Sequence, residues 1–496
     1  MKTLVQQLLL FSLLLPTLSW ASIKPRLIIL ADMGNEPDEM QQMIHMIACS
    51  NEFEIEGLIA VTGKYLRPGS RLGEYNWVTH PELYIEIIDA YAKVYKNLQI
   101  HAKGWPEPDA LKKRVAAGQT EYGIADVKEG NSSAGSELII QAVTKDDDRP
   151  VWIVVNAGAN TLAQALVDYR ATHTPEELEQ FVAKLRVFEN GSQDNAGAWI
   201  CSQFPAIHWI RSNYQTYAYG GPSRNKLGPH YWKPYANSTQ GQLDWQKEHI
   251  MVGHGALGAL YPPRRFHAWG EGVVNFMEGG GTIPWMGLVN KGLFDIDQPS
   301  WGGWSGRFSA EKKMNFWSRH NDIKKDEEKV APFYTYSEVS DTWTDPESNI
   351  TYSDNYVPVW RWRQAMYNDF QCRMDWCAQP YDKANHHPVA AFGKDLTDSI
   401  IRKTAAPGET IQLDASASKD PDNDELSFHW WHYQEAGTYA GLVYIPSSEE
   451  AKTQLTIPTG AGGRQIHIIL EIKDNNPIVS LFDYRRVVID VTPDES

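Results

Sequence analysis

The chain has 496 residues and a formal net charge of −16 at neutral pH. This acidic balance argues against a nucleic-acid backbone or an anionic membrane surface as the main partner, because both are negatively charged themselves. Hydrophobic residues make up 42% of the chain and charged residues 22%, which predicts a packed protein of at least two domains rather than a disordered chain.

The first 21 residues have the features of a secretory signal peptide. Lys2 supplies a positive charge at the start, and residues 8–15 form an apolar run that is too short to span a bilayer. Ser19 and Ala21 give a small-x-small site, so we expect cleavage after Ala21. No later segment is long and apolar enough for a membrane helix. We therefore expect a secreted protein, periplasmic or extracellular, without membrane insertion.

Residues 26–190 alternate between strand-like and helix-like segments. The strand-like segments are short, apolar and rich in β-branched residues, and they lie at 26–32, 55–62, 98–102, 151–158 and 185–190. Segments with helical apolar stripes lie at 40–47, 81–97, 133–145 and 160–170. This alternation predicts an α/β domain over residues 22–378, built on a mostly parallel sheet with helices on both faces.

Between about Ser212 and Gln379 this pattern weakens, and Gly, Pro and aromatic residues dominate. Two interpretations stay open for this region. Its aromatic side chains either pack under long surface loops or form a substrate rim, where some of the 19 Trp residues of the chain stack on sugar rings.

The four cysteines are too few for a disulfide scaffold, and their spacing lacks a zinc-binding pattern. Cys49 and Cys201 lie in apolar helical patterns, which predicts inert buried thiols. Cys372 and Cys377 are close enough in sequence to pair in an oxidising compartment. Whether they do so is left open by the sequence.

Residues 385–493 show period-two alternation with turn signals between the segments, which predicts a small immunoglobulin-like β-sandwich. Within it, Asp420, Asp422 and Asp424 alternate in a way that suggests calcium. The EF-hand pattern fails, however, because Trp431 stands where the distal Glu belongs. We therefore expect an acidic turn between two strands at this place.

Residues 27–47 combine a strand-like segment, an acidic turn and an amphipathic helix. The turn carries Asp32, Glu36, Asp38 and Glu39, and the segment has no Lys or Arg to neutralise them. One explanation is a bound divalent cation, Ca²⁺ above all. The other is a solvated turn whose acids meet the positive end of the helix. Ligands of parallel sheets bind beyond the carboxyl ends of the strands, so the turn has the expected place for an active site.

Several segments together resemble the nucleoside hydrolase superfamily. The strand and acidic turn over 27–43 look like its N-terminal signature, and the turn sequence GNEPDE is similar to that of a secreted branch of nucleoside-hydrolase-like, cellulose-binding proteins. The similarity continues through 51–63, 158–166, 189–200 and 301–308. It implies the nucleoside hydrolase α/β fold, followed by a C-terminal sandwich of the polycystic-kidney-disease type.

The resemblance also implies a site that holds Ca²⁺ on the acidic turn. Asp32 matches the residue that contacts both the metal and the attacking water, and Asp38 and Glu39 match the acidic pair that closes the turn. Asp32 and Asp38 are therefore the catalytic candidates, and both are expected to bind the metal with Glu39. A backbone carbonyl of Asn160 or Thr161 matches a further ligand, and Thr161 is our choice.

Four residues after the next strands match the sugar-binding positions of the family: Asn156, Glu189, Asn190 and Asp194. Their alternative role is ordinary turn and helix-capping chemistry. The chain also departs from true nucleoside hydrolases. The turn from Asp32 to Asp38 is longer, Lys64 stands in place of an Asn, and the distal Asp of the metal site has no counterpart.

The expected function is a glycosyl-bond hydrolase related to nucleoside hydrolases, which activates a metal-bound water and acts on a saccharide or an N-glycosyl substrate in polysaccharide degradation. The alternative is a non-catalytic carbohydrate-binding protein that attaches to cellulose or a similar polymer. Nucleoside salvage is less favoured because of the added domain and the abundant Trp. The sequence leaves the oligomeric state open.

Overall fold

The computed structural model describes residues 24–34, 37–66, 79–220, 238–263, 277, 279–290, 292–330 and 332–494. The signal peptide expected over residues 1–21 and Glu36 of the acidic turn lie outside the described residues. Within them, no helix combines the length and the apolar character that crossing a membrane requires.

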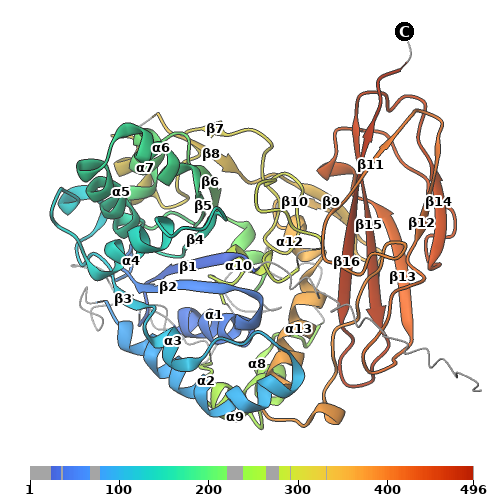
Figure 1. Cartoon of the computed structure of the whole chain (residues 1–496), viewed down its shortest axis with the longest axis horizontal. Helices are drawn as coiled ribbons and strands as arrows, with labels where there is room; N and C mark the ends of the chain where they lie inside the picture. The colour runs from blue at the N-terminus through green and yellow to red at the C-terminus, as the bar shows by residue number, and fades with distance from the viewer. Residues whose placement is uncertain are drawn as a thin grey trace, which may run out of the picture.

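An eight-stranded sheet lies at the centre of the first unit (Figure 1). Its strand order is β3-β2-β1-β4-β5-β6-β8-β7. The strands are β1 (Arg26–Ala31), β2 (Glu54–Ala60), β3 (Val115–Ala117), β4 (Val151–Val155), β5 (Leu185–Asn190), β6 (His208–Ser212), β7 (Lys313–Met314) and β8 (Tyr334–Ser337). All neighbours pair in parallel except β7 and β8. The prediction of a mostly parallel sheet is confirmed.

Helices cover both faces of this sheet, and β1 shows how they divide its residues. Leu27 and Ile29 belong to a core shared with α1 (Pro37–Ala48) and α2 (Pro81–His101). Ile28 and Leu30 point to the opposite face and belong to a second core. Four helices cover that second face: α4 (Ala134–Val143), α5 (Asn160–Thr172), α6 (Pro175–Ala183) and α7 (Ala196–Gln203). A strand buried on both faces is expected to be apolar, as β1 is from Leu27 to Ala31, after the paired Arg26.

Shorter helices complete the α/β unit: α3 (Pro108–Lys112), α8 (Leu243–Gln246), α9 (Gly255–Leu260), α10 (Ile283–Met286), α11 (Asn321–Glu327), α12 (Val357–Trp360) and α13 (Arg363–Asp375). Two small strands, β9 (Asp341–Thr344) and β10 (Thr351–Asp354), form an antiparallel hairpin beside α12. Many of the aromatic residues of this region are buried. The fully buried tryptophans include Trp285, Trp360 and Trp362.

One predicted strand is wrong. Residues 98–102 form the last turn of α2 and the residue after it. The buried stripe of that helix repeats every three or four residues, at Tyr84, Ile87, Ile88, Tyr91, Val94 and Leu98. A short apolar run does not by itself distinguish a strand from the end of such a helix. The strand that follows α2 in the sheet is β3, which lies later in the chain.

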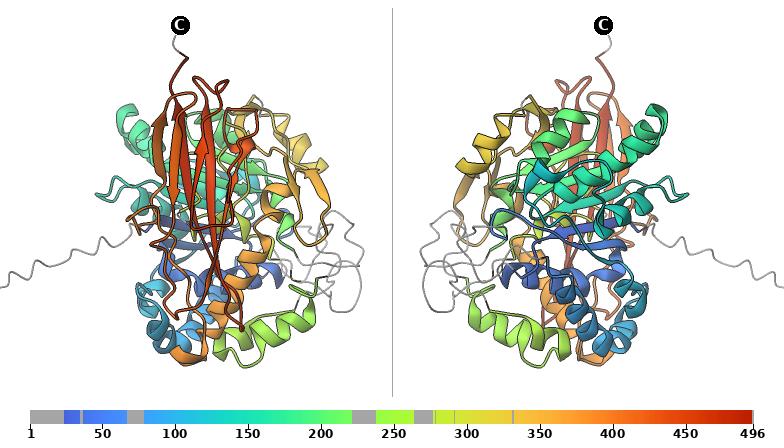
Figure 2. Two further views of the ribbon diagram at one scale, coloured as in Figure 1. Left: turned by 90° about the vertical axis from the view of Figure 1, so that its right-hand side faces the viewer. Right: turned by 90° about the vertical axis from the view of Figure 1, so that its left-hand side faces the viewer.

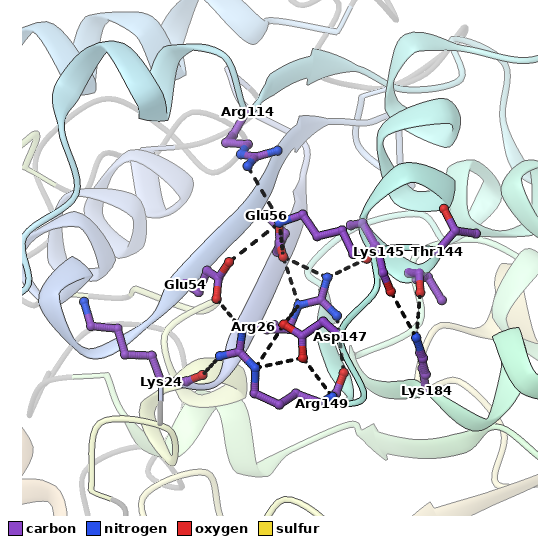
Figure 3. Close-up of polar contacts among 12 residues, drawn as sticks. Lys24, Arg26, Glu54, Glu56, Arg114, Thr144, Lys145, Asp147, Arg149 and Lys184 are labelled. Carbon is purple, nitrogen blue, oxygen red and sulfur yellow. Dashed lines mark hydrogen bonds and ion pairs between the residues drawn. The ribbon is translucent and has the colours of Figure 1, made fainter. Parts of the chain in front are cut away.

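An ion-pair network ties together the N-terminal ends of β1, β2 and β4 (Figure 3). Arg26 and Glu56 are fully buried, and an Arg26 nitrogen lies 2.8 Å from a Glu56 oxygen. Lys145 reaches the same carboxylate at 2.5 Å, and Arg149 pairs with Glu54 at 2.6 Å. Buried charges remain stable only when they are paired and hydrogen-bonded, so this network fixes the relative positions of the three strands.

The second unit is a β-sandwich, as predicted. One sheet has the order β11-β16-β15-β13, and the other pairs β12 with β14. The strands are β11 (Ile401–Ala405), β12 (Thr410–Asp414), β13 (Leu426–His432), β14 (Lys452–Thr456), β15 (Gln465–Asp474) and β16 (Phe482–Val491). The acidic residues Asp420, Asp422 and Asp424 lie in the turn between β12 and β13. Backbone N–H groups of Asp422 and Asp424 donate to Asp420 Oδ1, and His386 Nδ1 lies 2.9 Å from Asp422.

The sandwich lies along one side of the α/β unit (Figures 1 and 2), and the two share one core. Trp362 of the first unit packs 5.4 Å from Tyr484 and 5.7 Å from Trp431 of the second, measured between ring centroids. Arg486 is fully buried and donates from Nε to Leu293 O at 2.8 Å. The end of the connecting segment is buried, where Asn385 donates to Asp474 Oδ2 at 2.9 Å, whereas residues 380–383 are exposed.

All four cysteines are buried free thiols. Cys372 Sγ donates to Asn385 O at 3.1 Å, and Cys377 Sγ donates to Arg373 O at 3.4 Å, so these two residues do not form a disulfide. Burial raises the pKa of each thiol. Buried thiols of this kind are unreactive.

The network at the start of the strands predicts a large loss of stability for Glu56→Gln. The substitution leaves the buried Arg26 beside a neutral amide, which costs about 3–5 kcal/mol. Asp89→Asn is the control, because Asp89 is exposed and forms a surface pair with Lys112; its cost is expected below about 1 kcal/mol. Urea denaturation measures both. Equal losses in the two variants would contradict a structural role for the network.

The buried histidines predict that stability falls in acid. Burial lowers the pKa of His45 to about 3 and, with Arg486 nearby, that of His467 to about 2. Below about pH 6.5 the unfolded chain therefore takes up protons that the folded chain does not, and the free energy of unfolding decreases as pH falls. Between pH 6.5 and 5, His467→Gln should make this slope shallower by up to about 1.4 kcal/mol per pH unit. An unchanged slope would contradict the assignment.

Candidate functional site

The candidate site lies at the C-terminal ends of the parallel strands, opposite the ion-pair network of Figure 3. Asp32 follows β1 directly and is fully buried. Glu39, in the first turn of α1, is buried as well. Burial, the charge of Glu39 and the charge of Asp32 all raise the pKa of Tyr84. Two carboxylates and a phenol therefore share one buried region at the end of β1.

The chain turns from β1 into α1 through Gly34, which has a φ of +90°. A Cβ at this position would lie 2.8 Å from His80 Cδ2, so the turn needs glycine for its backbone conformation and for space. This turn separates Asp32, at the end of the strand, from Asp38 and Glu39 in the helix. The acidic residues thus come from two rigid elements.

Asp38 faces a glycine segment, Gly279–Gly281, which crosses the start of α1. A Cβ on Gly280 would lie 3.4 Å from Asp38 Oδ2, and the backbone N–H of Gly279 donates to Gln41 Oε1 at 3.1 Å. Asp38 Oδ1 is buried and accepts no hydrogen bond from any residue that the structure describes.

Asn156 directly follows β4, and Asn190 is the last residue of β5. Both contact the same glycine segment. Asn156 Nδ2 donates to Gly281 O at 3.3 Å, and Asn190 Nδ2 donates to Gly280 O at 3.0 Å. Their Oδ1 atoms are buried without a hydrogen-bond donor among the described residues. A Cβ on Gly281 would lie 2.2 Å from Asn156 Nδ2, so only glycine fits. This segment was not predicted as part of the site. Its three successive glycines are the feature of the sequence that could have indicated it.

The oxygen atoms of this region suit a hard divalent cation, because they belong to carboxylates and amides. Asp38, Asn156 and Asn190 each have a buried oxygen that accepts no hydrogen bond from the described residues. Two groups of three side chains elsewhere in the described part of the chain have possible ligand atoms within 4.8 Å of one another. They are His45, Cys49 and Asp369, and Asp420, Asp422 and Asp424. Asp32, Asp38 and Glu39 do not form such a group. They fit a cation by their chemistry, and their carboxylates are not already gathered around one point.

Asp194 holds the loops of the site together. Its Oδ2 accepts from the backbone N–H of Asn160 at 3.2 Å, and its Oδ1 accepts from that of Ala196 at 2.9 Å. Burial raises the pKa of this carboxyl to about 7, although backbone N–H groups oppose the shift. A Cβ on Gly158 would lie 2.6 Å from Asp194 Oδ2. Both carboxylate oxygens are thus engaged by backbone, and Asp194 positions the turns after β4 and β5.

Glu189 belongs to a buried ion-pair group under the site. Its Oε2 accepts from Arg211 Nε at 2.7 Å and from Trp209 Nε1 at 2.8 Å. The same Arg211 donates from Nη1 to Glu327 Oε1 at 2.8 Å. Arg211, Glu189 and Glu327 all have side chains with at most 1% exposure. Glu189 therefore connects β5 to β6 and, through Arg211, to α11. Its Oε2 is engaged inside the protein, and its Oε1 is buried without a donor among the described residues.

The predicted metal ligand Thr161 lies at the start of α5, where its side chain faces the loop after β3. Thr161 Oγ1 accepts from the backbone N–H of Gln119 at 2.9 Å. Its neighbour Asn160 donates from Nδ2 to Thr62 Oγ1 at 3.2 Å. Both side chains thus connect neighbouring loops, so a contribution of either residue to a metal rests on its backbone carbonyl alone.

Charged and aromatic side chains form the rim above these residues. Lys64, after β2, forms an ion pair with Asp322 of α11. Arg319 lies over the ring of Tyr217, with 3.8 Å between Cζ and the ring centroid. The charge of Lys64 is therefore paired with that of Asp322. This contribution of α11 was not predicted from the sequence.

Two family descriptions match the chain. Residues 26–308 match "Cellulose-binding Sde182, nucleoside hydrolase-like domain", and residues 410–491 match "Cellulose-binding protein Sde0182, C-terminal domain". No curated protein is similar enough to count as a match.

Among solved structures, a nucleoside hydrolase-related hypothetical protein from Saccharophagus degradans, described as associated with carbohydrate metabolism, is 36% identical. The similarity covers 95% of this chain and 100% of that one, with a TM-score of 0.78. The PKD domain of human KIAA0319 is 16% identical over 22% of this chain and 85% of that domain, with a TM-score of 0.16.

The first family description spans more than half of the chain, and the Saccharophagus relative spans nearly all of it. The mostly parallel sheet, the acidic residues after β1 and the added sandwich are the features that the sequence resemblance implied. The chain therefore belongs to the cellulose-binding Sde182 family, whose main domain is nucleoside hydrolase-like.

Proposed function

We propose that this protein is a secreted glycosyl-bond hydrolase that acts on a saccharide, with its chemistry at the C-terminal edge of the sheet. The observation that carries the proposal is the set of buried oxygens around Gly279–Gly281. Asp38, Asn156 and Asn190 each present one without a hydrogen-bond donor among the described residues, at the end of the sheet where Asp32 is also buried. Such oxygens favour a cation or a hydroxylated ligand.

Asp32, Asp38 and Glu39 would hold the cation, with Ca²⁺ as the best candidate. When bound, the cation supplies Lewis acidity and offsets the repulsion among these carboxylates. Asp32 then accepts a proton on its carboxylate from the water that attacks the anomeric carbon of the sugar. The glycosidic bond at that carbon breaks with its electron pair, and the departing group takes up a proton from solvent. Asn156 and Asn190 orient sugar hydroxyls through their amide groups.

The geometry changes two of the roles expected from the sequence. Glu189 and Asp194 were expected to bind substrate. Both oxygens of Asp194 accept from backbone N–H groups, and Glu189 Oε2 accepts from Arg211, while Glu189 Oε1 is buried without a donor among the described residues. In this proposal they are positioning residues. They hold the ends of β5 and the start of α5 so that Asn156 and Asn190 face the glycine segment.

The substrate class is supported by the relatives. The family is described as cellulose-binding, and the Saccharophagus protein as associated with carbohydrate metabolism. We therefore favour an oligosaccharide or a glycosylated plant or algal product over a free nucleoside. Both an O-glycosidic and an N-glycosidic bond fit the same chemistry.

A non-catalytic carbohydrate-binding protein is the second candidate, and one group of contacts favours it. Glu189, the Thr161 side chain and Lys64 are all committed to partners within the protein. Together with the separated acidic residues, these contacts fit a site that recognises a sugar without cleaving it. Turnover separates the two candidates.

The hydrolase proposal predicts that Asp32→Asn lowers kcat by at least about 100-fold, because it removes the base that takes the proton from water. The melting temperature should be kept, since a neutral amide relieves charge repulsion at a buried site. The turnover number kcat is measured in the presence of Ca²⁺ on panels of glycosides, oligosaccharides and nucleosides. Asp424→Asn, in the sandwich turn, is the matched control and should keep full activity. Wild-type protein without turnover on all panels would leave the binding function in its place.

The cation proposal predicts that Ca²⁺ binds chelator-treated protein and raises its melting temperature. At 100 times the dissociation constant the stabilisation should reach about 2.7 kcal/mol. Asp38→Asn should weaken calorimetric binding at least about tenfold, since one charged ligand is lost. Asp424→Asn tests the other acidic cluster of the chain. If that variant alone abolished the binding heat, the cation would belong to the sandwich turn, and the site on α1 would lose its metal.

A further inference from the structure

A groove with a volume of about 760 Å³ separates the β9–β10 hairpin from the sandwich. One wall consists of the hairpin, with Trp343 and the turn 345–347. The other wall consists of alternate residues of β13, Ser427, His429 and Trp431, together with residues of β15 and β16. Figure 1 shows the hairpin beside this edge of the sandwich. A volume of this size lies within the range of small-molecule sites.

The walls of the groove are fixed to each other. Asp341, at the start of β9, accepts from Arg307 Nε at 2.6 Å and from the Tyr433 hydroxyl at 2.6 Å. The backbone N–H of Thr342 donates to Glu435 Oε1 at 2.8 Å. Arg361 lies over the ring of Tyr433, 4.5 Å from its centroid. These contacts join the hairpin to the sandwich, so the groove exists before any ligand arrives, which reduces the entropy lost on binding.

Aromatic side chains supply the apolar part of the lining. Trp343 and Trp431 are both half-buried, so each has part of its ring supported by the protein and part facing the groove. Trp431 is held in place by Trp362 at 5.7 Å and Tyr433 at 5.1 Å, between ring centroids. Rigid aromatic surfaces of this kind bind the apolar C–H face of a pyranose ring.

Among the charged residues of the lining, carboxylates outnumber arginine and lysine. Carboxylates come from both walls, at Asp345, Glu347, Glu435, Glu449 and Glu471. The cations are fewer: Arg361 lies 3.5 Å from Asp341, and Lys473 lies over the ring of Phe482. Carboxylates accept hydrogen bonds from sugar hydroxyls and repel sulfated or uronic saccharides. Aromatic faces combined with acceptors and a negative field suit a neutral polyhydroxylated chain.

We propose that this groove is a second saccharide-binding site, which takes a stretch of a neutral pyranose chain such as a β-glucan. None of its lining residues belongs to the glycine-lined site at the edge of the sheet. The inference rests on the proposed function for the class of ligand, and on the groove itself for the place. The groove would hold a polymer while the edge of the sheet acts on a chain end or a side group.

The test is calorimetric titration of the mature full-length protein with cellohexaose. Trp343→Ala removes one aromatic wall and should weaken binding at least about tenfold. Because that change could loosen the hairpin, Ser427→Trp is a second variant, which fills the groove from an exposed position of β13 and should also weaken binding. Tyr444→Ala is the matched control, since Tyr444 is 80% exposed on the sandwich outside the groove. It should bind as the wild type does.

Asp32→Asn separates this proposal from the proposed function. If the groove is the site, Asp32→Asn keeps cellohexaose binding while Trp343→Ala and Ser427→Trp weaken it, whether or not any substrate is turned over. Unchanged affinity in both groove variants would overturn the inference. It would also be overturned if wild-type protein bound none of cellohexaose, xylohexaose and laminarihexaose, or if Asp32→Asn alone abolished all binding.

Discussion

The buried pair of Arg26 and Glu56 sets the frame on which the rest of the protein depends. Arg26 is the first residue of β1 and Glu56 the third of β2. Both are inaccessible to water, and the cost of burying them is offset only when the strands are in register. β1 then runs through the middle of the sheet with apolar residues on both faces. Its other end delivers Asp32 to the edge where the candidate site lies. One short strand thus has a structural charge at its start and a candidate functional one after its end.

The candidate site also contains buried polar side chains, which differ in how many of their oxygens accept hydrogen bonds within the protein. Both oxygens of Asp194 accept from backbone N–H groups, and Glu189 Oε2 accepts from Arg211, so these residues stabilise the loops. Asp38, Asn156 and Asn190 retain buried oxygens without a donor in the part of the chain that the structure describes, and so does Glu189 at Oε1. Asp194 therefore builds the edge of the sheet, whereas each of the other four side chains keeps one oxygen for a further partner.

The sandwich is part of the same structural unit as the α/β domain. Trp362 and Tyr484 pack across the boundary, and the buried Arg486 donates to backbone carbonyls of the α/β unit. The boundary also creates the groove, since neither the β9 hairpin nor the face of β13 encloses a volume alone. The sandwich, which the sequence predicts as a separate domain, therefore forms one groove together with the α/β unit. Saccharide attachment, if it occurs there, involves both units.

The sequence by itself determined the parts that depend on local patterns. Apolar β-branched runs and amphipathic stripes predicted the parallel sheet, period-two alternation predicted the sandwich, and the acidic turn after β1 identified the edge of the site. The failure at residues 98–102 has a local cause too, because a four- or five-residue apolar run fits a strand and the end of a long helix equally well.

Only the tertiary structure decided what each polar residue contacts. Arg211 pairs with both Glu189 and Glu327, Lys64 pairs with Asp322, and Asn156 and Asn190 donate to carbonyls of Gly281 and Gly280. These partners are separated by 22 residues or more, so no periodicity in the sequence records them. Sequence patterns report the environment of a residue along its own element. The choice between a structural ion pair and a ligand contact depends on side chains brought together by the packing of different elements.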